Sequence, residues 1–158
     1  MCRIVLVLFL ALSANSRHAI AAEPTKSNST IETLVAKIEK ETSSEKTLEH
    51  VKAIETHLVD RMRADQRALK DVTPKDFSYE NSTVSQALSS AENYFIFKPI
   101  LDYHLHRPKE EAMSKEGCRA IENEVLYSFS FGRPEGELPS GDTELALKIH
   151  RKICGKLK

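Results

Sequence analysis

The sequence has no tryptophan, few cysteines and little glycine, with three cysteines and five glycines in 158 residues. It also has no net charge, because 23 acidic residues balance 23 basic ones. A neutral chain has no overall field that would attract nucleic acid or anionic lipid. We therefore expect no nucleic-acid partner.

The familiar catalytic signatures are absent as well. The sequence has no G-x-S-x-G nucleophile elbow, no H-E-x-x-H zinc motif, no phosphate-binding loop and no glycine-rich nucleotide fingerprint. Carboxylates are plentiful, but they fall on the polar faces of predicted helices. We therefore interpret them as solvent-exposed surface residues and not as an acid/base pair. The sequence therefore favours binding over catalysis, and we expect no cofactor.

No apolar run is long enough to cross a membrane. The longest, Ile4 to Leu12, has nine residues, whereas a spanning helix needs about 20. Arg3 precedes this run, and Ala19-Ile20-Ala21 follows it with small residues at the positions that a signal peptidase reads. We predict a signal peptide over residues 1–21, cleaved after Ala21, and a secreted protein (periplasmic if bacterial) without a transmembrane span.

Cleavage would leave two cysteines, Cys118 and Cys154. Exported proteins with two cysteines usually pair them. The bridge would close a loop of roughly 37 residues and stabilise the fold by about 4 kcal/mol through lost chain entropy. We predict a Cys118–Cys154 disulfide.

Helical periodicity dominates the rest of the chain, and no β-alternating run interrupts it. A polar arm over 22–28 precedes a capping box at Ser29, which predicts the first helix start. Ser44 to Lys70 predicts a second, long helix, which Pro74 ends.

Three further helices are predicted after that proline. The third begins at Thr83, with Thr83 and Gln86 as a capping pair, and Pro99 should kink or split it. The fourth runs from Lys109 to about Phe129. The last starts at Asp142 or Thr143 and ends at Cys154, where Gly155 is a suitable stop.

Aromatic residues are missing from 22–76, and all those after the signal lie between Phe77 and Phe131. Aromatic side chains bury the most surface, so we expect an aromatic-rich core over 77–158 with an aliphatic helical hairpin, 29–72, packed on it. The predicted fold is a single all-α domain over 29–158. It is a bundle of four to five amphipathic helices closed by one disulfide.

The narrow apolar stripe of the second helix is our first candidate for a binding surface. If the stripe is exposed, it would contact another protein or an extracellular surface, or mediate self-association through the first two helices. Its residues are Leu48, Val51, Leu58 and Met62.

The C-terminal helix carries a second candidate, a basic contact patch. Cations can bind an acidic partner or surface, but they can also simply complement a helix C-terminus, which we favour. The patch consists of Lys148, Arg151, Lys152, Lys156 and Lys158.

Two alternative functions remain open. A carrier of a small apolar ligand would line a pocket in the helical core with the side chains Tyr94, Phe95, Phe97, Ile100, Leu101 and Tyr103. A hydrolase would need a free cysteine with a histidine base, drawn from His104, His106 or His150.

Two smaller motifs complete the candidate sites. His104 and His106 are weak metal candidates, because the i, i+2 spacing does not share a helix face and no third ligand has motif spacing. Asn28 and Asn81 begin N-x-S/T sequons and are candidate glycosylation sites.

Overall fold

The computed structural model describes residues 26–108, 113–130 and 141–157, with side chains omitted at 26–29 and 128–130. This part of the chain is helical and contains no strand, which confirms the all-α prediction. The α-helices are α2 (Lys26–Lys40), α3 (Ser44–Ala68), α4 (Ser82–Leu101), α5 (Lys115–Ser130) and α6 (Gly141–Cys154). A 3-10 turn, η1 (Leu69–Asp71), follows α3, and a π-helical segment, η2 (Asp102–His106), follows α4.

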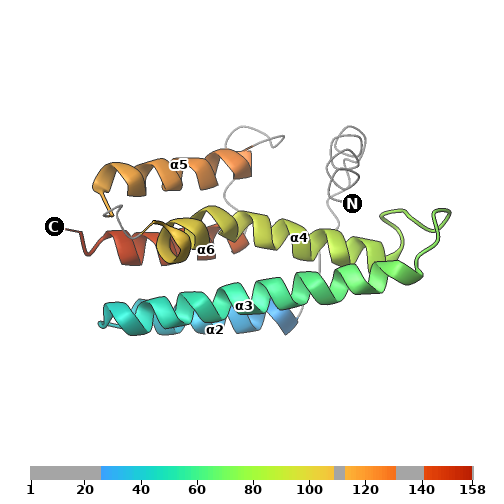
Figure 1. The fold of residues 1–158 in the computed structure, drawn as a ribbon, viewed down its shortest axis with the longest axis horizontal. Coiled ribbons are helices and arrows are strands. Elements are labelled where there is room, and N and C mark those ends of the chain that lie inside the picture. The colour runs from blue at the N-terminus through green and yellow to red at the C-terminus, as the bar shows by residue number, and fades with distance from the viewer. Residues whose placement is uncertain (1–25, 109–112, 131–140, 158) are drawn as a thin grey trace.

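The longest helices, α3 and α4, pack against each other as a hairpin (Figure 1). α2 lies against α3 and α6, while α6 also contacts α4 and α5. The α3–α4 hairpin extends beyond α5 and α6 at one end and finishes there in the loop 72–81 (Figure 1). No helix within the described ranges combines the length and the apolar character needed to cross a membrane.

The core is aliphatic rather than aromatic, contrary to our expectation. Among the residues whose side chains the structure describes, all five α-helices contribute to one buried cluster, and Phe97 is its single aromatic side chain. Four other aromatic side chains are exposed, namely Phe77, Tyr79, Phe95 and Tyr127. The prediction failed because the helix face, not the residue type, decides what is buried. The aliphatic members of the cluster are Ile31, Val35, Ile38, Val51, Ile54, Leu58, Ile100, Leu101, Val125, Ala146, Leu147, Ile149 and Ile153.

The stripe proposed as a contact surface on α3 faces this core. Val51 and Leu58 are buried, Met62 is half-buried and Leu48 is 37% exposed. Because α2, α4 and α6 pack on α3, these residues form no continuous exposed surface. The stripe therefore lacks the continuous exposed face that the predicted contact surface requires, while self-association through the first two helices stays a prediction.

The starts of α2 and α4 differ from the prediction. α2 begins at Lys26, so the predicted arm is already helical at residues 26–28 and Ser29 lies inside the helix. Asn81, not Thr83, caps α4, because its side-chain oxygen accepts hydrogen bonds from the backbone amides of Thr83 and Val84 at 3.0 and 3.4 Å. Gln86 instead donates to the Asp65 carboxylate at 2.8 Å.

Pro99 does not end α4, which continues to Leu101 and then into η2. The amide of Asp102 donates to the carbonyls of Lys98 and Pro99, so the backbone beyond the proline stays paired. α5 begins at Lys115, and residues 113–114 before it are not helical, so the predicted start at Lys109 is wrong.

The end of α6 agrees with the sequence. The helix ends at Cys154, and the Gly155 amide donates to the Arg151 carbonyl at 2.8 Å. The predicted signal peptide 1–21, its cleavage site, and Lys158 lie outside the described residues, as does residue 131 in the aromatic segment.

Candidate functional site at the disulfide

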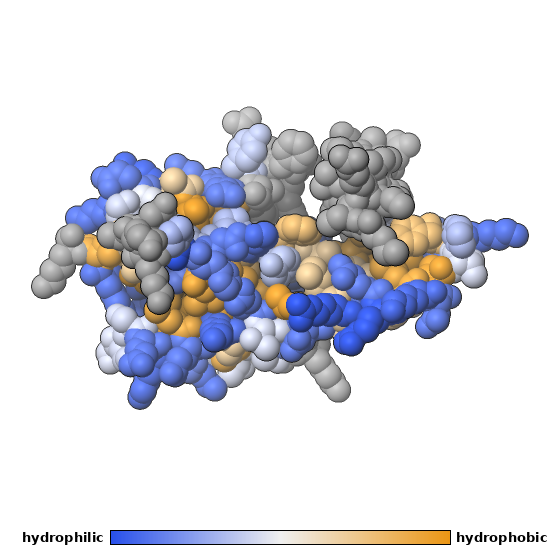
Figure 2. All heavy atoms as spheres, in the orientation of Figure 1, coloured by the Kyte–Doolittle hydropathy of each residue, from blue (hydrophilic) through white to orange (hydrophobic). Residues whose placement is uncertain are grey.

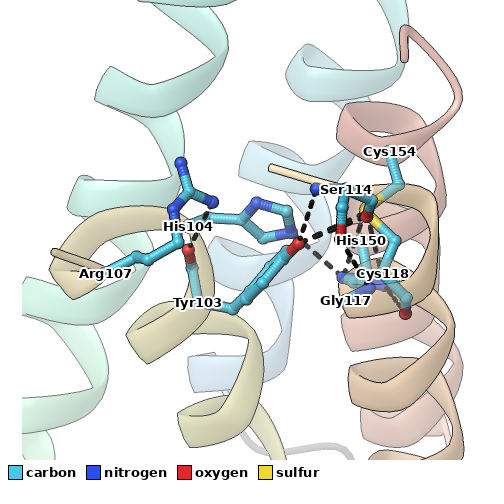
Figure 3. The surroundings of a disulfide bond; sticks show 8 residues. All are labelled: Tyr103, His104, Arg107, Ser114, Gly117, Cys118, His150 and Cys154. Atoms are coloured by element: carbon cyan, nitrogen blue, oxygen red, sulfur yellow. Dashed lines mark hydrogen bonds between the residues drawn. A yellow bond between two sulfur atoms is a disulfide. The ribbon is translucent and has the colours of Figure 1, made fainter. Parts of the chain in front are cut away.

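The predicted disulfide joins α5 to α6. Cys118 and Cys154 are bonded, with their Cα atoms 6.1 Å apart (Figure 3). A bridged cysteine has no thiolate, and the thiolate is the nucleophile. The bridged protein therefore cannot use the Cys/His hydrolase chemistry that the sequence left open.

Two histidines lie beside this bridge and form a chain of hydrogen bonds. His150 Nε2 is 2.8 Å from the Cys118 carbonyl oxygen, and His150 Nδ1 is 3.0 Å from His104 Nε2. A carbonyl only accepts, so His150 donates through Nε2. In the neutral ring Nδ1 is then an acceptor, and His104 donates to it through Nε2. The carbonyl thus fixes the tautomers of both rings.

Burial keeps these rings neutral. It lowers the pKa of His104 to about 3, with His150 and Arg107 contributing in the same direction. It also lowers the pKa of His150, although the hydrogen bond to the Cys118 carbonyl opposes the shift. At neutral pH the site therefore holds two uncharged imidazoles.

Tyr103 lies beside His104, and its hydroxyl points towards the bridge (Figure 3). Its hydroxyl lies 4.0 Å from Cys118 Sγ and 3.4 Å from both the backbone oxygen and the amide nitrogen of Ser114. A Cβ atom at Gly117 would come within 2.5 Å of this hydroxyl oxygen, so a glycine permits the approach. The Ser114 side chain accepts from the Gly117 amide at 2.9 Å and helps to start α5.

Arg107 covers the other face of the same tyrosine. Its guanidinium carbon lies 5.2 Å from the centroid of the Tyr103 ring, and Nη1 donates to the Tyr103 carbonyl at 3.3 Å. Two buried nitrogens here lack a hydrogen-bond partner, Arg107 Nε and His104 Nδ1. In the tautomer derived above, His104 Nδ1 carries a lone pair that accepts no hydrogen bond.

The arrangement also concentrates metal-ligating atoms. Donor atoms of His104, His150 and Cys154 all lie within 4.8 Å of one another. In the bridged state the sulfur is already bonded to its partner cysteine. The site then offers two neutral imidazoles and a relay of hydrogen bonds to the backbone of α5.

The two histidines that the sequence singled out for metal do not work together. His106 Nε2 lies 2.5 Å from a carboxylate oxygen of Glu55 on α3, and it is exposed. His104 turns to His150 instead. The structure therefore does not bring the two weak metal candidates together, because His106 is exposed beside Glu55 and His104 lies against His150.

The C-terminal basic residues are engaged within the chain. Lys152 Nζ donates to the Glu39 carbonyl at 2.6 Å, and Lys156 Nζ donates to the Thr42 carbonyl at 3.2 Å. These acceptors lie at the C-terminus of α2 and just after it, so the cations complement the negative end of α2 rather than of their own helix.

The other two described cations of the patch form ion pairs. Lys148 pairs with Glu144 at 3.2 Å, and Arg151 pairs with Glu122 at 2.6 Å. Four of the five patch residues thus have partners in the chain, and the fifth lies outside the described residues.

The six residues proposed for a ligand pocket do not face one common space. Phe97, Ile100 and Leu101 are buried in the core cluster, whereas Phe95 is 56% exposed. A groove of about 390 Å³ lies between α2 and α6, and it is lined by none of the six.

Sequence reasoning named His104 and His150 separately but missed their contact, because 46 residues separate them. It also missed Tyr103, Ser114 and Gly117 as neighbours of the bridge. One usable signal was present, since His150 precedes Cys154 by four residues and so shares its helix face.

Comparison with known proteins adds no relative. No protein-family profile matches the chain, and no curated protein or solved structure is significantly similar to it.

Proposed function

We propose that this is a secreted helical protein that acts by binding another macromolecule through the end of the α3–α4 hairpin. The supporting observation is a pair of aromatic side chains in the loop 72–81. Phe77 is 40% exposed and Tyr79 is 46% exposed. We call these two residues the aromatic tip.

The loop that carries the aromatic tip is held by its own hydrogen bonds. The Thr73 hydroxyl donates to the Asp76 carboxylate at 2.6 Å, and the Asp76 amide donates to the Thr73 carbonyl at 3.0 Å. The Asn81 amide closes a further turn on the Ser78 carbonyl at 3.1 Å. Turns on either side of the tip therefore limit the conformations of Phe77 and Tyr79.

Such a loop suits recognition for two physical reasons. Tyrosine and phenylalanine are enriched in the centres of protein interfaces, because one side chain buries a large apolar area. A loop already held in shape also loses less conformational entropy when it binds. The hydrophobic colouring of the space-filling view extends along the hairpin towards this end (Figure 2).

Export fits the rest of the molecule. The bridge is of the kind that persists in oxidising compartments, in agreement with the proposed signal peptide 1–21 and a mature bundle of four to five helices.

Asn81 lies at the base of the aromatic tip, and its side-chain oxygen makes the helix cap. Its amide nitrogen, the atom to which a glycan is attached, is not used in that cap. We include glycosylation at Asn81 in the proposal. The side chain of Asn28 lies outside the described residues.

Site-specific photo-crosslinking tests the proposal. A photoreactive phenylalanine analogue replaces Tyr79 in one protein and Tyr127 on α5, which is 69% exposed, in a matched control. Both proteins are exposed to extracellular material and intact cell surfaces of the source organism. We expect a discrete crosslinked product from position 79 and none from position 127.

Two further results decide the outcome. Excess unlabelled wild-type protein should suppress the product, and Phe77→Ser should weaken it, whereas Lys75→Ser in the same loop should not. Equal crosslinking from both positions, or a product that wild-type protein does not displace, would contradict binding through the aromatic tip.

A further inference from the structure

His104, His150 and Cys154 form a cluster on η2 and the C-terminal part of α6. The C-terminal end of α6 lies at the opposite end of the molecule from the loop 72–81 (Figure 1). The cluster is independent of the proposed binding function. Cys118 is bonded to Cys154, so a fourth potential ligand adjoins the three. Two cysteines and two histidines are a ligand set that zinc uses in tetrahedral structural sites.

We propose that reduction of the Cys118–Cys154 bridge converts this cluster into a tetrahedral Zn²⁺ site, with His104 Nε2, His150 Nδ1 and both sulfurs as ligands. The disulfide and the zinc ion would then be alternative links between α5 and α6. The zinc ion would also link η2, because His104 lies on that segment.

The distances between the donor atoms support this assignment. With the usual zinc bond lengths, two nitrogen ligands lie about 3.3 Å apart, and a nitrogen and a sulfur about 3.6 Å apart. In the bridged protein the two facing nitrogens are 3.0 Å apart, and Cys154 Sγ is 3.9 Å from His150 Nδ1 and 3.6 Å from Nε2, the nitrogen that stays bonded to the Cys118 carbonyl. The two separations between the proposed ligand atoms are within a few tenths of an ångström of the tetrahedral values.

The sulfurs need the larger adjustment. Bonded disulfide sulfurs lie about 2.0 Å apart, and two zinc-bound sulfurs lie about 3.8 Å apart. Once the bond is broken, rotation of the two cysteine side chains can separate the sulfurs.

A second shell already exists around these ligands. His150 Nε2–H donates to the Cys118 carbonyl at 2.8 Å, which leaves the Nδ1 lone pair available to a metal once the contact with His104 Nε2 is given up. The Tyr103 hydroxyl, 4.0 Å from Cys118 Sγ, lies where it can donate to a thiolate. On His104 the proton moves from Nε2 to Nδ1, and the metal replaces the hydrogen bond between the two rings.

Charge explains why reduction is required. Zn²⁺ held by two neutral imidazoles alone would leave two positive charges in a buried site next to the Arg107 cation. Two thiolates cancel that charge. The bridged protein should therefore reject the ion, and the reduced protein should accept it.

The chemistry balances with a dithiol as reductant. The dithiol gives two electrons and two protons to the bridge and becomes a disulfide, while the protein gains two thiols. Zinc binding then releases both thiol protons to the solvent. Reoxidation of the thiols by a disulfide would expel the ion and restore the bridge.

Cobalt titration of the full mature chain tests the proposal. The protein is prepared in the bridged form and, after treatment with a dithiol and its removal under argon, in the reduced form. We expect the reduced form to bind one Co²⁺ with visible bands typical of tetrahedral coordination and a sulfur-to-cobalt charge-transfer band. Zn²⁺ should abolish both signals, and the bridged form should show neither.

Matched histidine variants distinguish this site from casual binding by free thiols. His104→Ala should weaken zinc binding to the reduced chain by more than about 100-fold, whereas His106→Ala on the same segment should leave it unchanged. Circular dichroism records whether each reduced protein stays helical.

Three results would overturn the proposal. They are metal binding by the bridged form, no metal binding by the reduced wild type whether or not it stays folded, and equal affinities of the two histidine variants.

Discussion

At position 117 the backbone of α5 comes so close to Tyr103 that a side chain cannot be added without moving the ring. This contact shows which residue-level features the sequence could and could not predict. The cysteine pairing followed from compartment and number, because two cysteines allow one intramolecular bridge. The Tyr103–Gly117 and His104–His150 contacts depend on how η2 packs against α5 and α6. No local sequence pattern predicts that packing.

Gly117→Ala combined with Tyr103→Phe measures the first of these contacts. The added methyl group meets the tyrosine hydroxyl oxygen, which Tyr103→Phe removes. We expect Gly117→Ala to be less favourable in the wild type than in the Tyr103→Phe background, by about 1 kcal/mol in the free energy of unfolding. Urea denaturation of the four proteins gives this coupling. A coupling near zero would show that the two residues do not meet.

The buried histidines make stability depend on pH. Because the pKa of His104 falls to about 3 in the folded protein from an ordinary 6.5, the unfolded chain binds the proton first as the pH drops. Its contribution is fully present above pH 6.5 and is lost progressively towards pH 3, by up to about 1.4 kcal/mol per pH unit. The lowered pKa of His150 acts in the same direction.

Urea denaturation of the bridged protein across this range, compared with His104→Gln, isolates the effect. The glutamine variant lacks the titrating ring but keeps the carboxylates, so its stability should fall less steeply with acid. Identical slopes for the two proteins would contradict a buried neutral His104.

At the scale of elements, apolar periodicity predicted the existence and type of the helices well. α3 begins at Ser44 as predicted, and α6 ends at Cys154. The boundaries that failed depended on tertiary contacts. Gln86 bonds to Asp65 on α3 instead of capping α4, and α4 continues through Pro99 because the next amides find carbonyl partners.

The contact between α6 and the C-terminus of α2 gives a prediction at this scale. Lys152→Met keeps most of the aliphatic stem but removes the cation that donates to the Glu39 carbonyl. We expect a loss of about 0.5–1 kcal/mol in the free energy of unfolding. Lys148→Met, which breaks only an exposed pair with Glu144, should cost less. Chemical denaturation at low and high salt checks the order, and a reversed order would refute the role of Lys152.

At the scale of the whole molecule, composition was a poor guide to the core. The aromatic-rich half was expected at the centre, but aliphatic residues of α2 and α3 occupy it together with Phe97. Side chains that are close in sequence on α4 differ in burial, because successive helical residues point about 100° apart. Phe95 and Phe97 therefore end on different sides.

Alanine substitution of these two phenylalanines tests the arrangement. Phe97→Ala should cost about 3–5 kcal/mol, since it empties a fully buried position. Phe95→Ala, at a site 56% exposed, should cost about 1 kcal/mol or less. Thermal and urea unfolding of both proteins gives the comparison. Similar losses would mean that the aromatic residues share one core after all.

The hydrogen-bond chain from His104 through His150 to the Cys118 carbonyl underlies both the pH prediction and the zinc proposal. The long-range ¹H–¹⁵N spectrum of the histidine rings in the bridged protein, recorded at about pH 5, below the ordinary histidine pKa, tests it most directly. We predict that His104 is neutral with its proton on Nε2, and that His150 carries a proton on Nε2, which it donates to the Cys118 carbonyl. A protonated His104, or one with its proton on Nδ1, would contradict the account.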